Sequence, residues 1–297
     1  MLLFRSVSCN NSREKPMKVL GKTVTLILLT IFFIGFCVLL YPAVSQYWNS
    51  KVQSRVVVDY TNEVEEMDPE MHDKLLSQAV HYNEQLAELD APLFSYNEIE
   101  GYDTSLDPSG NGVMGVISID KLRVELPIRH TTSDDVLSNS CGHLEGTSLP
   151  VGGRSTHCVL SAHRGLPSAE LFTHLDKMEV GDTFTITTLG DVLTYEVESI
   201  VVVLPNDSSQ LAIEYGADRC TLLTCTPYGI NTHRLLVKGV RIDTVDKKKM
   251  NITAEAYIVD RLIVSAAVAL PILFVLIVIV IFKPVKKNTE LGGRRGS

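Results

Sequence analysis

The chain has 297 residues, of which 45% are hydrophobic, and a formal net charge of −8. Residues 45–260 contain 33 acidic and 16 basic side chains, whereas both ends of the chain are basic. Because an acidic domain repels phosphate backbones, this charge distribution argues against nucleic acid as a partner. The length suffices for one large domain or two small ones.

Two apolar runs, residues 23–43 and 262–282, are long enough to cross a bilayer as helices. The first exceeds the apolar region of a cleaved signal peptide, so we expect it to be retained as an anchor, with cleavage as the alternative. Basic residues are concentrated in segments 1–22 and 283–297. The positive-inside rule then predicts a two-pass protein of the cell membrane, in contact with lipid, with both termini cytoplasmic and the middle extracellular.

A helix is expected after the first run, within segment 44–112. Asp68 is a favoured N-cap residue, and Pro69 is favoured at the first helical position. Apolar residues then recur at spacings of three and four as far as Leu89, which is the pattern of an amphipathic helix. From residue 93 on, the segment is polar and rich in turn formers, so we expect irregular structure there.

Short β-branched runs separated by glycine, proline and aspartate fill residues 113–245. This spacing is typical of an all-β barrel or sandwich, and no alternation of strands with helices suggests a parallel sheet. Gly190 and Asp191 predict a hairpin turn. Residues 246–261 would link the domain to the second span. The expected strands cover residues 115–119, 124–128, 156–162, 183–188, 192–203, 220–224 and 235–242.

Cys225 ends one expected strand, and Arg234 precedes the next after a short loop. In an antiparallel hairpin the two are neighbours, which sets a thiol nucleophile beside a guanidinium able to hold an oxyanion. Strand alternation turns Cys220 to the other face, so we expect it in the core. The sequence does not decide whether Cys141 and Cys158 form a disulfide. The sequence contains no Cys-x-x-Cys pair, so we expect no structural zinc site.

A base for Cys225 has to come from elsewhere in the chain. His163 follows the expected strand 156–162 and precedes a glycine-containing loop, where the rim of a barrel presents side chains. His143 and His233 are the alternatives, although His233 points away from the face of its neighbour Arg234. The remaining histidines are better explained as surface or structural residues.

Three motifs together resemble the sortases, the cysteine transpeptidases of Gram-positive bacterial surfaces. They are Ser161 to Gly165 (SAHRG), Thr221 to Cys225 (TLLTC), and Arg234 nine positions after the cysteine. Three further segments are similar to the class C branch, which builds pili, and the second apolar run fits that branch too. These segments are 110–115, 142–150 and 226–234. The resemblance covers roughly residues 67–282.

The resemblance implies an eight-stranded β-barrel with flanking helices and no cofactor or metal. It implies that Cys225 attacks the Thr–Gly bond of an LPxTG-like sorting signal and forms a thioester. His163 would protonate the leaving amine and later deprotonate the incoming one, while Arg234 would hold the substrate and its oxyanion. Leu223 and Thr224 are expected to contact the substrate. In class C enzymes the partners are LPxTG-bearing pilin subunits, and the acceptor is a pilin lysine.

Class C enzymes also carry a lid with an Asp-Pro-aromatic motif, which this chain matches imperfectly. Its nearest counterpart is the segment from Asp90 to Phe94 (DAPLF), so a lid would use Asp90 to meet Arg234 and Phe94 to cover Cys225. Two other functions remain compatible with the sequence. One is attachment of surface proteins to peptidoglycan by the same triad, and the other is a non-catalytic barrel that binds or presents pilus or wall proteins.

Overall fold

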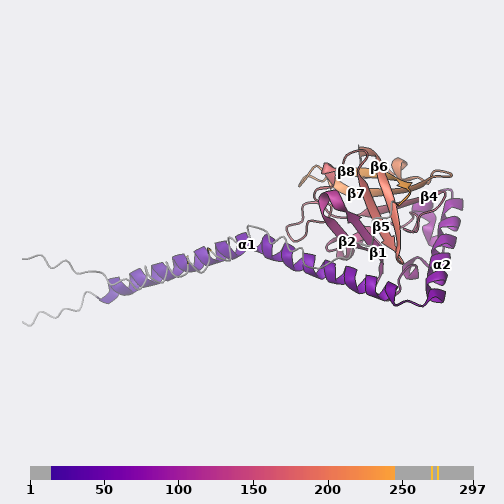
Figure 1. Cartoon of the computed structure of the whole chain (residues 1–297). Helices are drawn as coiled ribbons and strands as arrows, with labels where there is room; N and C mark the ends of the chain where they lie inside the picture. The colour runs from indigo at the N-terminus through magenta and orange to yellow at the C-terminus, as the bar shows by residue number, and fades with distance from the viewer. Residues whose placement is uncertain (1–14, 245–268, 270–272, 274–297) are drawn as a thin grey trace, which may run out of the picture. The chain divides into compact units, whose positions relative to one another are not determined.

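The computed structural model describes residues 15–244 together with residues 269 and 273. The chain divides into two units, Met1–Asp246 and Lys247–Ser297. The first unit contains a long helix, a shorter helix and a closed barrel of eight strands (Figure 1). Apart from residues 269 and 273, the expected second span 262–282 lies outside the described residues, as do segments 246–261 and 283–297.

Helix α1 (Lys15–Glu65) is much longer than the apolar run 23–43 that predicted it. Its part Ile27–Glu65 is long and apolar enough to cross a membrane, by length and composition alone. Towards the end of the helix, Val57 and Tyr60 are buried against the first barrel strand. The apolar pattern could not predict this continuation, because the added turns are held by contacts with the barrel rather than by their own hydrophobicity.

Helix α2 (Pro69–Glu88) confirms the predicted amphipathic helix. Asp68 is its N-cap, and the carboxylate accepts a hydrogen bond of 2.9 Å from the backbone N–H of Glu70. One face is buried through Leu75, Ala79, Tyr82, Asn83 and Leu86. Short helical turns lead from α2 to the barrel: α3 (Pro92–Ser95), η1 (Tyr96–Glu98) and η2 (Tyr102–Thr104).

The barrel has the eight strands that the resemblance implied, seven of which the sequence pattern also predicted. Their order around the barrel is β1-β2-β3-β4-β7-β8-β6-β5, and the sheet is closed. The strands are β1 (Val113–Ile119), β2 (Val124–Arg129), β3 (Cys141–His143), β4 (Thr156–Ser161), β5 (Thr183–Thr188), β6 (Asp191–Val203), β7 (Asp218–Thr226) and β8 (His233–Ile242). The loops between them contain η3 (Asp120–Leu122), α4 (Asp134–Leu137), η4 (Leu175–Lys177) and η5 (Ser209–Leu211).

Two features of the barrel differ from the sequence-based expectation. The pairs β2–β3 and β4–β7 are parallel, although no parallel pairing was expected. The β2–β3 connection holds only the four-residue helix α4, and the β4–β7 connection runs through β5 and β6, so neither leaves a recognisable strand–helix alternation in the sequence. Strand β3 was missed because its three residues, Cys-Gly-His, carry neither β-branched side chains nor a usable alternation.

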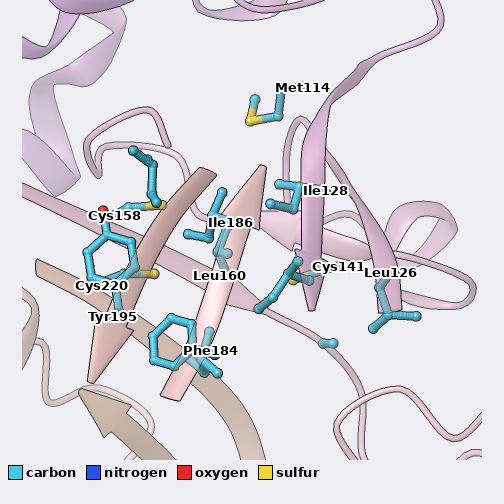
Figure 2. Packing of buried hydrophobic residues seen from close by; sticks show 14 of the residues in the cluster. Met114, Leu126, Ile128, Cys141, Cys158, Leu160, Phe184, Ile186, Tyr195 and Cys220 are labelled. Atoms are coloured by element: carbon cyan, nitrogen blue, oxygen red, sulfur yellow. The ribbon is translucent and has the colours of Figure 1, made fainter. Parts of the chain in front are cut away.

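The barrel interior holds three of the cysteines among large apolar side chains such as Phe184 and Leu160 (Figure 2). Cys141, Cys158 and Cys220 are buried and free, so the disulfide between Cys141 and Cys158 is not formed. The core position predicted for Cys220 is confirmed. Burial raises the pKa of the Cys141 and Cys220 thiols well above the ordinary value, which keeps both protonated at neutral pH.

Candidate active site on strands β4, β7 and β8

The hairpin of β7 and β8 brings the candidate thiol and guanidinium together. Cys225 lies directly opposite Arg234 in the antiparallel register, so their side chains leave the same face of the sheet. The Nη1 of Arg234 donates to the backbone oxygens of Asn231, at 3.3 Å, and His233, at 3.2 Å. These two bonds hold the guanidinium beside the loop that joins the strands.

The parallel pairing of β4 with β7 brings His163 to the same row. The register pairs Ser161 with Leu223, and the ladder continues through a 3.2 Å bond from the Ala162 N–H to the Leu223 oxygen. His163 and Cys225 each lie two residues beyond this last pair, so an extension of the register would place them level. Since neighbouring strands lie about 4.8 Å apart, residues level on adjacent strands are close enough for their side chains to meet.

Cys225 and Arg234 therefore share one outer face at the ends of β7 and β8, and His163 follows the end of β4, the other neighbour of β7, so the candidates come in the order His163, Cys225, Arg234 across three adjacent strand ends. His163 and Cys225 are both partly exposed. Within residues 15–244, neither the imidazole of His163 nor the thiol of Cys225 forms a hydrogen bond, so both are free to engage a substrate or each other. Catalytic hydrogen bonds are often completed only when substrate is bound.

An apolar patch covers the outer face next to this row. We define the apolar patch as buried Val159, Leu211 and Leu236 with the partly buried residues packed on them, Leu93, Leu144, Val201, Val203 and Leu223. Leu223 precedes Cys225 by two positions on the same face, so its side chain can line the surface along which a substrate reaches the thiol. The side chain of Thr224 instead faces inward, is 1% exposed, and donates a 2.8 Å hydrogen bond to the Ala162 oxygen. A substrate contact through that side chain does not fit its position.

The segment expected to form a lid lies over the apolar patch, but not in the expected way. Leu93 packs on the patch, whereas the Phe94 ring is 81% exposed and so does not cover a thiol. Within the described residues, Asp90 forms no ion pair with Arg234. Close packing of this segment depends on Gly146, where an added Cβ would lie 2.6 Å from the Leu93 Cα.

A cavity of about 620 Å³ separates the same segment from the loop that precedes β7. Leu89, Leu93 and Phe94 line one side, and Leu211, Ile213 and Tyr215 line the other. The mainly apolar lining suits an apolar ligand or peptide side chain. Because Leu93 lines the cavity and belongs to the apolar patch, movement of this one segment would change both.

The two alternative bases are placed elsewhere. His143 is fully buried; its Nε2 lies 2.9 Å from the Ser148 oxygen and its Nδ1 lies 3.0 Å from the Tyr102 hydroxyl oxygen. His233 pairs with Thr226 and leaves the face opposite to that of Arg234. Of the three candidate bases, His163 is the one that follows a strand end beside the end of β7. In the part of the chain that the structure describes, no cluster of three or more histidine, cysteine or acidic side chains is arranged to hold a metal ion.

His157 shows how a second histidine on the outer face is used. Its side chain is buried, and Nδ1 donates a 2.9 Å hydrogen bond to the Ala212 oxygen. The Nε2 lies 2.8 Å from the Thr221 hydroxyl oxygen and accepts from it in the neutral tautomer. Burial lowers the pKa of His157 to about 4, with smaller contributions from nearby charges. This histidine is a neutral structural link between β4, β7 and the loop before β7.

Comparison with known proteins identifies the barrel. Residues 117–242 match the sortase domain family. Sortase A of Bacillus anthracis is 25% identical over 225 residues, which cover 75% of this chain and 97% of that protein.

Crystal structures give a stronger likeness. Sortase C1 of Streptococcus agalactiae is 44% identical with a TM-score of 0.59, and the match covers 64% of this chain and all of that one. Sortase C of Streptococcus pneumoniae is 42% identical with a TM-score of 0.56, over 64% of this chain and 97% of that one. With this identity over the full length of a solved relative, the chain belongs to the sortase family of cysteine transpeptidases, in its class C branch.

Proposed function

We propose that this chain is a membrane-anchored sortase that polymerises pilin subunits. The observation that supports the proposal is that His163, Cys225 and Arg234 come at the ends of three adjacent strands, with Cys225 directly opposite Arg234. A nucleophile, a proton carrier and an oxyanion holder are the groups that acyl transfer requires. The sorting signal is LPxTG-like, as the resemblance implies.

The first half of the reaction cleaves the sorting signal. The Cys225 thiolate attacks the carbonyl carbon of the Thr–Gly bond, and the negative charge that develops on the oxygen is held by the Arg234 guanidinium. When the C–N bond breaks, protonated His163 gives its proton to the leaving glycine amine. The product is a thioester between Cys225 and the threonine carbonyl.

The second half transfers the threonine carbonyl to an amine. The acceptor attacks the thioester carbon as a neutral amine, neutral His163 takes the proton that the nitrogen loses as the amide forms, and the Cys225 thiolate leaves, which restores the starting thiolate and protonated His163. With a pilin lysine as acceptor, the new bond is an isopeptide bond between subunits. The class C relatives support this acceptor, since the Streptococcus pneumoniae sortase C is described with reference to pilin substrate specificity.

The substrate path and the topology complete the proposal. Leu223 and the rest of the apolar patch would bind the apolar residues of the sorting signal next to the thiol. The apolar part of α1 supports anchoring at residues 23–43, and we propose a second span at 262–282 with both termini in the cytoplasm. The barrel would then face outwards, where pilins are exported.

The test is mass spectrometry of the full chain in detergent with an LPxTG peptide. We expect an adduct with the mass of the peptide up to threonine, sensitive to hydroxylamine and missing in Cys225→Ala. Absence of the adduct in the unmodified chain would contradict the enzymatic proposal and favour the non-catalytic barrel. In cells lacking the protein, loss of pilin ladders supports polymerisation, whereas loss of wall-bound surface protein with intact ladders would favour peptidoglycan attachment.

A further inference from the structure

Arg164 directly follows His163, and the sequence alone gives it no role beyond membership in the SAHRG motif. Its side chain is only 7% exposed, although it is permanently charged. Its Nη2 lies 2.6 Å from a carboxylate oxygen of Asp176, in the turn η4. A guanidinium buried to this extent has to be held by several partners to offset its lost hydration.

The other contacts of Arg164 reach the cysteine side of the candidate site. Its Nη1 donates a 3.3 Å hydrogen bond to the hydroxyl of Thr226, the residue after Cys225. Its Cζ lies 5.9 Å from the centre of the Tyr228 ring, in the loop between β7 and β8. One guanidinium thus contacts the end of β7, the loop that follows it, and the turn η4 through charge, hydrogen bond and cation–π contact.

The backbone around Arg164 is fitted to this arrangement. Gly165 has φ +79°, and an added Cβ would lie 3.0 Å from the Tyr228 ring, so the ring packs against the chain directly. The loop then folds back on itself through a 3.1 Å bond from the Phe172 N–H to the His163 oxygen. The β4–β7 ladder ends at Ala162, before His163. Backbone pairing alone therefore does not fix the position of the imidazole relative to the thiol.

We propose that Arg164 is a positioning residue of the transfer reaction. Its side chain joins the loop carrying His163 to the strand end carrying Cys225, and so sets the distance between the imidazole and the thiol. This inference rests on the proposed function, since it concerns the same pair of groups. The amine that exchanges a proton with His163 is held at the carbonyl carbon bound to Cys225, so the imidazole must lie within hydrogen-bond reach of that position. Loosening this link therefore slows proton transfer without removing any reacting group.

The test compares Arg164→Gln with Arg219→Gln, both in the full chain in detergent. Arg219 is the matched control because it is also a largely buried arginine paired with carboxylates, Glu198 at 2.6 Å and Glu214 at 2.9 Å, towards the other end of β7. For Arg164→Gln we expect kcat for LPxTG peptide transfer to fall about 10- to 100-fold, with KM within about twofold and a changed pH–rate profile. Arg219→Gln is expected to lower the melting temperature but to keep the pH–rate profile.

Variants of Tyr228 provide a second test of the same inference. Tyr228→Phe keeps the ring face over Arg164 and is expected to lose less kcat than Tyr228→Ala. The inference is overturned if Arg164→Gln transfers with the unmodified kcat and pH profile, or if its loss of activity matches that of Arg219→Gln at equal melting temperature. Failure of the unmodified chain to form the Cys225 thioester would instead overturn the proposed function, so the two failures are distinguishable.

Discussion

The barrel carries two sets of cysteine and histidine side chains, one inside it and one at the outer ends of its strands. The inner set, Cys141, Cys158, Cys220 and His143, is buried. The outer pair, His163 and Cys225, is partly exposed and not hydrogen-bonded to the described part of the chain. The difference teaches that residue type does not decide function here: position at a strand end on the outer face leaves a side chain free to react.

The largest expected effect separates the two sets of thiols. Cys225→Ala is expected to reduce peptide transfer on the order of 10³-fold or more, because the proposed covalent intermediate cannot form. Cys220→Ala should leave the transfer rate close to that of the unmodified chain and lower stability by about 1 kcal/mol, through a small cavity. Transfer assays and urea unfolding measure both, and a Cys220 variant as inactive as the Cys225 variant would break the comparison.

The two histidines should differ in the same way. His163→Gln is expected to slow transfer by about 10²- to 10⁴-fold with little change in unfolding, since it removes the proposed proton carrier. His143→Gln should keep the chemistry but lower the free energy of unfolding by about 1–3 kcal/mol, because buried polar groups of Tyr102 and Ser148 lose a partner. An active His163 variant would contradict the assignment and return attention to the other candidates.

His157 sharpens the comparison, because it lies on the outer face and is nevertheless buried. Its pKa of about 4 in the folded chain is below the value of 6.5 expected when unfolded, so the unfolded state binds more protons between these pH values. The free energy of unfolding should therefore fall as pH drops from about 6.5 to 4, by up to about 3 kcal/mol. Urea unfolding at pH 7.5 and 4.5 measures the loss. His157→Gln should weaken this pH dependence, and an unchanged dependence would exclude this histidine as its source.

The smallest expected effect concerns how the outer thiol is shielded. Leu93→Ala removes the side chain that packs on the apolar patch, so alkylation of Cys225 by iodoacetamide should become modestly faster. Phe94→Ala and Asp90→Ala are expected to leave the rate unchanged, because the ring is exposed and no Asp90–Arg234 ion pair forms within residues 15–244. A faster reaction in these two variants alone would restore the lid first expected from the sequence.

Much of the fold could be predicted because local signals agreed with the final structure. The Asp68 cap, the three- and four-residue spacing of α2 and the β-branched runs all correspond to elements of the structure. The strand ends predicted the neighbourhood of Cys225 and Arg234 directly, since one hairpin contains both. Here sequence distance and spatial distance are both short, and the pattern alone suffices.

What could not be predicted depends on contacts between distant segments. The pairing of β4 with β7 joins residues more than sixty positions apart, and no local pattern encodes its register. The same applies to the 7% exposure of Arg164, which follows from Asp176, Thr226 and Tyr228 meeting around it. The sequence pattern and the family motif single out His163, but its position beside the end of β7, next to Cys225, depends on the pairing of β4 with β7.

The continuity of α1 has a mechanical consequence. A helix rises about 1.5 Å per residue, so the turns from Ala43 to Glu65 extend about 33 Å beyond the apolar run. Because Val57 and Tyr60 are fixed to the first barrel strand, these turns form a strut rather than a slack tether. In an anchored chain, such a strut would set the distance of the barrel, and of Cys225 with it, from the lipid surface.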